Sequence, residues 1–319
     1  MSYQASNQSQ TNDYTTDTSN IKQTTMKYID HQIGSNYKRI NWIAIFGHFL
    51  SAIAMIGLLG DKKLVFPYTE SYLSWNNVSD GTLCPIGSRQ FNTSSGQFCI
   101  SAVTKPVYCD DSVPPECYGI NLGWLIISFH VLSFVFQFGA AITDYCGPIC
   151  QYRYSDMIAA NKNPLRFIEY GFSASVMLIA IALLNGVTDI NLITSIAVLT
   201  SACQLCGLAV EYVEQRWLKW MLHLTGWLQF FWAYGIIGHA FFKSIEAAED
   251  AGGQGPPDFV YVIVIALFLL YASFGFVQFY ELVFPINPYT KESAYVTLSL
   301  TAKLLLGWMI FSNVLLLAE

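Results

Sequence analysis

The sequence is short of charge. Only 12% of its 319 residues are charged and 53% are hydrophobic, whereas about a quarter of the residues of a soluble domain are charged. The formal net charge is -6, and no long run of lysine or arginine offers the basic surface that nucleic acid requires. The composition therefore excludes nucleic-acid binding and favours a protein that lies in a lipid bilayer.

The first 37 residues also lack a long apolar run. They are rich in Ser, Thr, Gln, Asn and Tyr, and none of their stretches has the apolar core of a signal peptide. We expect residues 1–37 to form a disordered tail and residues 38–319 to form the membrane domain.

Long apolar runs dominate the rest of the sequence. About 20 helical residues are needed to cross the roughly 30 Å of hydrocarbon in a bilayer. The runs are apolar on all sides, whereas a soluble helix has one apolar stripe and a charged opposite face. Seven runs predict an all-α bundle of seven transmembrane helices at about 41–60, 118–143, 165–188, 190–210, 217–243, 259–280 and 293–318.

Lysine and arginine are distributed unevenly over the connections between these helices. Cytoplasmic connections are enriched in both residue types. The short connections of one side carry only Lys243, and its long connection adds Lys62, Lys63, Arg89 and Lys105. We therefore expect the amino terminus in the cytosol and the carboxyl terminus outside the cell, with the protein in the plasma membrane. The side assigned to the cytosol holds Lys22, Lys27, Lys38, Arg39, Arg153, Lys162, Arg166, Arg216, Lys219 and Lys291.

The long connection, residues 61–117, has the features of an extracellular segment. Four cysteines cluster there, which an oxidising exterior explains, and they allow three disulfide pairings between which the sequence does not choose. Alternating apolar and polar residues over 98–103 predict a small β-hairpin. The cysteines are Cys84, Cys99, Cys109 and Cys117.

Four further cysteines lie near the ends of the second and fourth helices that we assign to the cytosol. The pairs Cys146/Cys150 and Cys203/Cys206 are spaced as on a helix, and four thiolates are able to bind a metal. Buried packing residues are the interpretation that we favour.

One lysine lies deep inside the last apolar run. Burying Lys303 there costs at least a few kcal/mol, and it is too far from the interface for its amine to reach water. One explanation is a structural ion pair with Glu169. The other, which we favour, is a desolvated amine that forms a Schiff base with a carbonyl ligand.

Glu169 is the carboxylate that lies well inside a predicted span, and a protonated Schiff base needs such a counter-ion. Counted along the helices at 1.5 Å per residue, Glu169 lies about 7 Å and Lys303 about 15 Å from the same face. Helical side chains tilt toward the amino-terminal end of their helix, so we expect the two groups to meet. Ser299, one turn before Lys303, either hydrogen-bonds the same nitrogen or bonds back to its own helix.

Other polar and aromatic residues fall near this level. His48 and Gln137 lie about 9–11 Å from the expected cytoplasmic face, and with Glu169 and Ser299 they predict a hydrated cavity because such groups need partners inside hydrocarbon. We add His130 as a further member, although it is also consistent with an ordinary core histidine. The expected walls of the ligand pocket are Met177, Ser133, Trp227, Phe230, Tyr271 and Phe274.

Two segments resemble the heliorhodopsins, which are retinal proteins with a cytosolic amino terminus. The resemblance covers about residues 40–319 and implies covalent all-trans retinal on Lys303, Glu169 as its counter-ion and a homodimeric assembly. It also implies that Ser299 neighbours the attachment site and that His48 belongs to an internal polar cavity. The segments are Arg166-Phe167-Ile168-Glu169-Tyr170 with Ser173-Ala174-Ser175-Val176-Met177, and Tyr295-Val296-Thr297-Leu298-Ser299-Leu300-Thr301-Ala302-Lys303.

The sequence departs from its relatives at informative positions. Gln137 stands where the heliorhodopsins usually have a histidine, and Ala174 where they have a serine. Microbial rhodopsin pumps resemble the chain less, because they carry an aspartate where Ser299 stands here and a second carboxylate on the third helix. An uphill proton pump needs an acceptor and a donor on opposite sides of the switch, so we do not expect pumping.

These features predict a photoreceptor with a slow photocycle and an unknown signalling partner, rather than an enzyme. No nucleophile–base pair or metal cluster in the sequence favours catalysis. The alternative is light-activated passive conduction of protons or other ions. Its expected mouths are Glu211, Glu214 and Glu281 on one side and Asp189, Glu246, Glu249 and Asp258 on the other.

Overall fold

The protein was analysed as a computed structural model. It describes residues 5–60, 64–78, 84, 88–93, 96–106, 119–145, 153–253 and 255–315. Of the cysteines singled out in the sequence, Cys109, Cys117, Cys146 and Cys150 lie outside the described residues.

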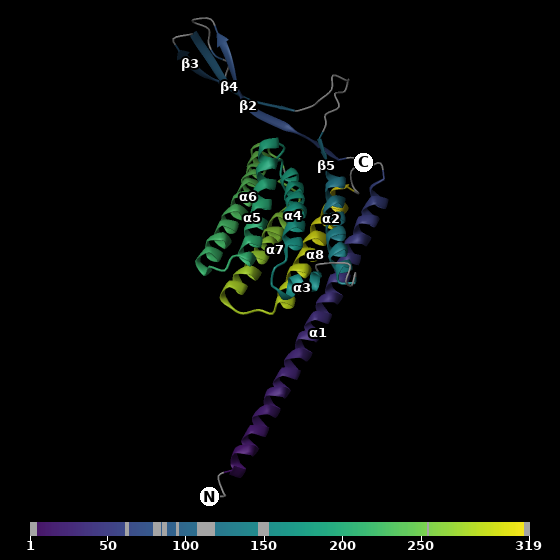
Figure 1. The fold of residues 1–319 in the computed structure, drawn as a ribbon. Helices are drawn as coiled ribbons and strands as arrows, with labels where there is room; N and C mark the ends of the chain where they lie inside the picture. Colours follow the sequence, from purple (N-terminus) through teal and green to yellow (C-terminus); the bar gives the residue numbers. More distant parts are fainter. Residues whose placement is uncertain are drawn as a thin grey trace.

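Long helices packed side by side form the body of the molecule (Figure 1). The part of the chain that the structure describes contains seven of them and one short helix, α3 (Tyr154–Ala159). The seven-helix architecture predicted from the sequence is thus confirmed. The long helices are α1 (Ala5–Leu59), α2 (Leu122–Thr143), α4 (Pro164–Leu184), α5 (Ile190–Tyr212), α6 (Arg216–Asp250), α7 (Asp258–Val283) and α8 (Pro288–Ile310), which a π-helical turn (Phe311–Leu315) extends.

Six of these helices have the length and mean hydropathy of a membrane span, judged over the described residues. The helix outside that set is α6, whose tryptophans, histidines and glutamine lower its mean hydropathy. Its stretch 220–242 nevertheless contains no Asp, Glu, Lys or Arg, and its 35 residues exceed the ~20 that a crossing needs. Because α6 also packs between α5 and α7, we treat it as the remaining span.

Helix boundaries follow local signals that the apolar runs alone do not contain. Asn163 and Asn287 cap α4 and α8 with their side chains, and a proline begins each helix, which is the first-turn position that proline favours. The start of α8 therefore lies five residues before the apolar run. The predicted end of α4 is also corrected, because Gly186 adopts a positive φ of 81° just after Leu184.

The amino-terminal segment differs from the disordered tail that we expected over residues 1–37. Helix α1 begins at Ala5 and projects well beyond the bundle (Figure 1). The sequence has no proline before Pro67, and Gly34 is the one glycine before Gly47. The helix that continues from the span therefore meets no proline and a single glycine, which costs only about 1 kcal/mol.

The connection between α1 and α2 forms two small antiparallel sheets. Strands β2 (Thr69–Val78), β4 (Gly96–Pro106) and β3 (Arg89–Thr93) pair in that order, and β1 (Val65–Pro67) pairs with β5 (Gly119–Asn121). The predicted hairpin is present as β3–β4, and β2 adds a third strand. A disulfide joins Cys84 to Cys99, which settles the pairing of two of the four loop cysteines.

The strands lie at one end of the bundle, which we call the sheet end, and α1 projects from the opposite end, the tail end (Figure 1). A hydrogen bond from the Thr69 amide to the Thr188 carbonyl ties β2 to the turn after α4. Because α8 runs toward the sheet end, the last described residues lie on that side. That the tail end faces the cytosol stays a prediction of the charge distribution.

Buried side chains divide the bundle into two chemically different halves. Toward the sheet end the core is apolar, with residues such as Leu122, Ile126 and Leu306 fully buried. Most of the buried charged and amide side chains lie instead toward the tail end, among them Arg166 and Glu292. Lys303 lies where the two halves meet, so most of the polar groups around it lie toward the tail end.

Candidate functional site

The Lys303 amine is buried in an ion pair. Its Nζ lies 2.6 Å from Oε1 of Glu169 and donates a hydrogen bond to Oγ of Ser299 at 2.9 Å. The side chains of Lys303 and Glu169 are each 3% exposed. The predicted meeting of the two groups is therefore observed, as is the contact with Ser299.

Glu169 is held by hydroxyl groups from two helices. Ser133 on α2 donates to its Oε1 at 2.6 Å, and Ser173, one turn further along α4, donates to the same oxygen at 2.8 Å. With Lys303, three helices thus converge on a single carboxylate oxygen. Such bonds to an ionised group are among the stronger hydrogen bonds in proteins, and they fix the position of the negative charge beside the amine.

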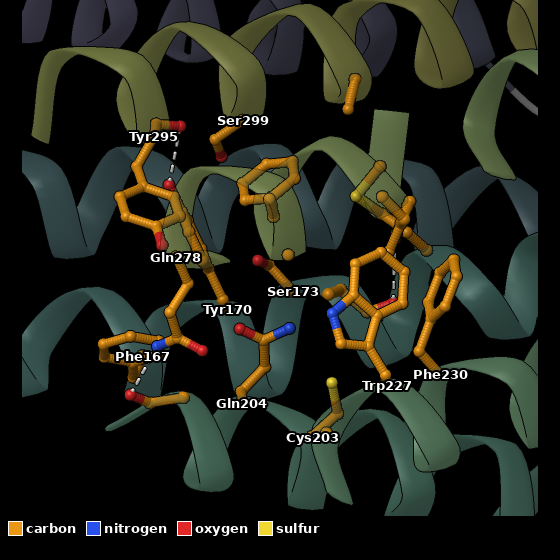
Figure 2. A pocket seen from close by; sticks show the side chains of 18 of the residues that line it. Phe167, Tyr170, Ser173, Cys203, Gln204, Trp227, Phe230, Gln278, Tyr295 and Ser299 are labelled. Atoms are coloured by element: carbon orange, nitrogen blue, oxygen red, sulfur yellow. Dashed lines mark hydrogen bonds between the residues drawn. The ribbon is translucent and has the colours of Figure 1, made fainter. Parts of the chain in front are cut away.

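An aromatic pocket begins at Lys303 and lies between α4, α5, α6, α7 and α8 (Figure 2). Close packing of its wall depends on Gly275, where a Cβ atom would lie 2.6 Å from the Trp227 indole. Met177, Trp227, Phe230, Tyr271 and Phe274, five of the expected wall residues, all line it. A largely apolar cavity with a buried amine at one end suits an elongated apolar ligand that carries a carbonyl group.

His48 contacts His130, which we had added to the expected cavity. Its Nδ1 lies 3.1 Å from Nδ1 of His130, and both rings are fully buried. Within the described part of the chain, neither Nε2 atom has a hydrogen-bond partner. A Cβ atom at Gly307, one turn beyond Lys303, would lie 2.7 Å from Nε2 of His130, so the histidine pair packs beside the lysine-bearing helix.

Gln137 lies in a second, smaller cavity on the tail-end side of Glu169. Glu169, Arg166 and Glu292 line the same cavity. The residues that we expected to share one polar cavity therefore lie at three neighbouring sites. Glu169 with Gln137 borders the small cavity, Ser299 borders the aromatic pocket, and His48 lies with His130.

A buried ion network next to this cavity was missed in the sequence. Arg166 pairs with Glu211 at 2.5 Å and with Glu292, while Lys291 pairs with Glu211 at 2.8 Å and with Glu281 at 3.0 Å. Three carboxylates therefore face two cations. From the sequence, Arg166 and Lys291 were assigned to the connections at the membrane surface. One signal of burial was present, because Arg166 lies inside a helix that begins at Pro164.

The remaining cysteines that the structure describes show no metal site. Cys203 lines the aromatic pocket, and Cys206 lies against Gln229. No group of three or more candidate metal ligands occurs among the described residues.

Comparison with solved structures shows which fold this is. The chain is similar to the thermophilic rhodopsin from Rubrobacter xylanophilus, with a TM-score of 0.54 and 13% identity over 86% of this chain and 95% of that one. It is also similar to the light-driven proton pump rhodopsin of Coccomyxa subellipsoidea, with a TM-score of 0.55 and 16% identity over 87% and 96% of the two chains. The chain thus has the fold of these rhodopsins, with seven helices around a buried lysine that has a carboxylate partner.

The family follows from the sequence itself. Residues 97–315, more than half of the chain, match the family model described as heliorhodopsin. The chain therefore belongs to the heliorhodopsin family, and this membership supports a retinal-binding, light-responsive membrane protein. Among curated proteins, none matches the sequence significantly.

Proposed function

We propose that the protein is a light receptor in which all-trans retinal is bound covalently through Lys303, with Glu169 as the counter-ion. The observation that supports this most directly is the buried Lys303–Glu169 pair at the end of an aromatic pocket. An isolated structural ion pair would not need the cavity beside it. The amine and the apolar walls fit an aldehyde with a long hydrocarbon body.

The chain's own residues would position charge around the attachment point. Bound retinal supplies visible absorption and light-driven isomerisation. Glu169 stabilises a positive charge on the Lys303 nitrogen, and Ser133 and Ser173 hold the carboxylate in place. Tyr170 closes the tail-end side, because its hydroxyl donates to the Tyr295 carbonyl and its ring lies 5.2 Å from the Lys303 nitrogen.

The same residues support a receptor with a slow photocycle rather than a pump. Ser299, not a carboxylate, lies one turn before Lys303, and the half of the bundle toward the sheet end is apolar. The buried His48–His130 pair, which packs against Gly307 one turn beyond Lys303, offers imidazole nitrogens inside the protein to a proton that leaves the Lys303 nitrogen. We therefore propose that the proton stays within the molecule during the photocycle.

Replacement of Glu169 by glutamine tests the counter-ion. Loss of the opposite charge disfavours the protonated nitrogen. We therefore expect the visible band of the retinal-loaded variant to disappear at a pH about one unit or more below that at which the band of the unmodified pigment disappears. We also expect its maximum to shift to longer wavelength. Spectrophotometric titration of the purified pigment measures both effects.

Ser173→Ala provides the matched control, because it removes one hydrogen bond from Glu169 and leaves the charge in place. Its titration should differ much less from that of the unmodified pigment. If Glu169→Gln and Ser173→Ala titrate alike, another group is the counter-ion.

One observation favours a second function, passive conduction. A cavity of about 430 Å³ at the tail end is bordered by Glu214 and Glu281. From Glu281 the ion network leads through Lys291, Glu211 and Arg166 to the small cavity at Glu169. Ionisable groups thus reach from the tail end to Lys303, whereas the apolar half beyond it would have to open.

Voltage-clamped illumination distinguishes these functions. A receptor gives no steady photocurrent, and passive conduction gives a current that reverses near the equilibrium potential of the permeant ion. A current of constant direction at every voltage and at symmetric pH would show pumping and contradict our account of the site.

A further inference from the structure

The far end of the aromatic pocket lies against α5 and α6. Helix α8 packs mainly against α1 and α7, whereas α5 packs against α4 and α6, so α5 is across the bundle from Lys303. A ligand that is attached to Lys303 and fills the pocket must end near Cys203, Gln204, His223 and Gly226. The groups on these two helices therefore decide which chemistry is accepted at the end of the ligand that is remote from the lysine.

Three polar side chains at this end satisfy one another. Trp227 donates from Nε1 to Nε2 of His223 at 2.9 Å, so the neutral imidazole carries its hydrogen on Nδ1, which donates to Oε1 of Gln278 at 3.1 Å. Gln278 in turn donates from Nε2 to the Gly207 carbonyl at 3.0 Å. This chain of bonds fixes the Trp227 indole and leaves the histidine without a free nitrogen for a ligand.

Gln204 is different. Figure 2 shows the amide of Gln204, a residue of α5, pointing into the pocket. Its side chain makes no hydrogen bond to any part of the chain that the structure describes. Gln204 is half-buried, and its amide offers two donors and an acceptor oxygen. A ligand that fills the pocket removes this amide from water, and polar groups in the interior of a protein are almost always hydrogen-bonded.

We propose that this end of the pocket is specific for a retinal whose ring carries an oxygen, as a hydroxyl or a keto group. This inference rests on the proposed function, since it concerns the ligand of the same site. A plain hydrocarbon ring leaves the Gln204 amide unpaired in an apolar pocket, whereas a ring oxygen accepts a hydrogen bond from its N–H groups. Sites with a buried polar group discriminate against ligands that leave the group unpaired, and one such bond corresponds to a preference of about tenfold.

A competition experiment tests the proposal on the full chain. The apoprotein in membranes is incubated with all-trans retinal and all-trans-3-hydroxyretinal, which are present in equal amounts and in excess over the protein. The bound chromophores are then released with hydroxylamine and separated as oximes. We expect the hydroxylated oxime to be enriched about tenfold. Equal amounts, or an excess of plain retinal, would overturn the proposal and would indicate that water satisfies Gln204. Pigment formation with neither aldehyde would instead refute the proposed function.

Two variants assign the preference to one side chain. Gln204→Leu should bind both aldehydes with no preference, because its side chain has no hydrogen-bonding group. Gln229→Leu is the matched control, since Gln229 lies on α6 outside the pocket and contacts Cys206; it should keep the tenfold enrichment. A Gln204→Leu pigment that still prefers the hydroxylated chromophore would show that another group recognises the ring oxygen. The result for the unmodified protein stands even if a variant does not fold.

Discussion

Replacement of Lys303 by alanine should abolish the visible absorption band that forms when all-trans retinal is added to the apoprotein. The change removes the amine that forms the covalent bond and leaves the pocket walls in place. The measurement is the absorption spectrum after retinal is added, with insertion of the protein checked in the same membranes. A visible band that persists in the variant and resists hydroxylamine would contradict the assignment of Lys303.

Two further variants separate attachment from charge pairing. Lys303→Arg keeps a cation opposite Glu169 but has no amine able to form the bond, so it should also fail to form pigment. Because alanine leaves the Glu169 carboxylate buried without its cation, the single variant is also expected to lose about 3–5 kcal/mol of stability. The double variant Lys303→Ala/Glu169→Gln removes both charges and should recover much of that loss without recovering pigment.

Replacement of Arg166 by glutamine should destabilise the folded protein strongly. The side chains of Arg166, Glu211 and Glu292 are at most 2% exposed, and removal of one partner from a buried ion pair leaves an uncompensated charge. The expected loss is about 3–5 kcal/mol in the free energy of unfolding, because Glu292 loses its cation and Lys291 alone remains to pair with Glu211 and Glu281. The change is measured by unfolding the protein in mixed detergent and monitoring the loss of its helical circular-dichroism signal.

The exposed ion pair Lys243–Glu246 supplies the control. Its side chains are 61% and 59% exposed, so solvent screens the pair and Lys243→Gln should leave the unfolding transition unchanged. Similar transitions for Arg166→Gln and Lys243→Gln would show that the tail-end network contributes nothing to stability.

The sequence was most informative where one-dimensional rules apply. The length of each apolar run predicts a span, because a helix rises by a fixed amount per residue and the bilayer has a fixed thickness. The same counting put Glu169 about 7 Å and Lys303 about 15 Å from one face, and the tilt of helical side chains reduces that gap. The cost of burying a lone charge required both groups to have partners. These arguments need no knowledge of how the helices are rotated.

Which side chains contact one another across the bundle was harder to predict from the sequence. Sequence depth placed His48 near Gln137, whereas the structure pairs His48 with His130. Depth along a helix axis specifies one coordinate, and the rotation of each helix specifies which neighbour a side chain meets. The same reason applies to Ser133, whose bond to Glu169 depends on the packing of α2 against α4.

The buried ion network at the tail end was also not predictable from the sequence. Arg166 and Lys291 lie near the ends of membrane helices, where charges normally contact water or lipid headgroups, and by depth alone they are indistinguishable from interfacial residues. Burial arises because Tyr154 of α3 packs against Glu292 and donates a hydrogen bond to it at 3.1 Å. It also arises because the five charged groups come from four helices, α4, α5, α7 and α8. Only the packed bundle brings these five charges together.

The sequence by itself determined the class of protein, the number of spans and the identities of the buried lysine and its carboxylate, because lipid imposes the same length and charge rule on every helix. The tertiary structure decided the hydrogen bonds to Glu169, the histidine pair, the ion network and the unpaired amide of Gln204 in the pocket. Each of these depends on the angle at which one helix faces another, and that angle results from the packing of all the helices together.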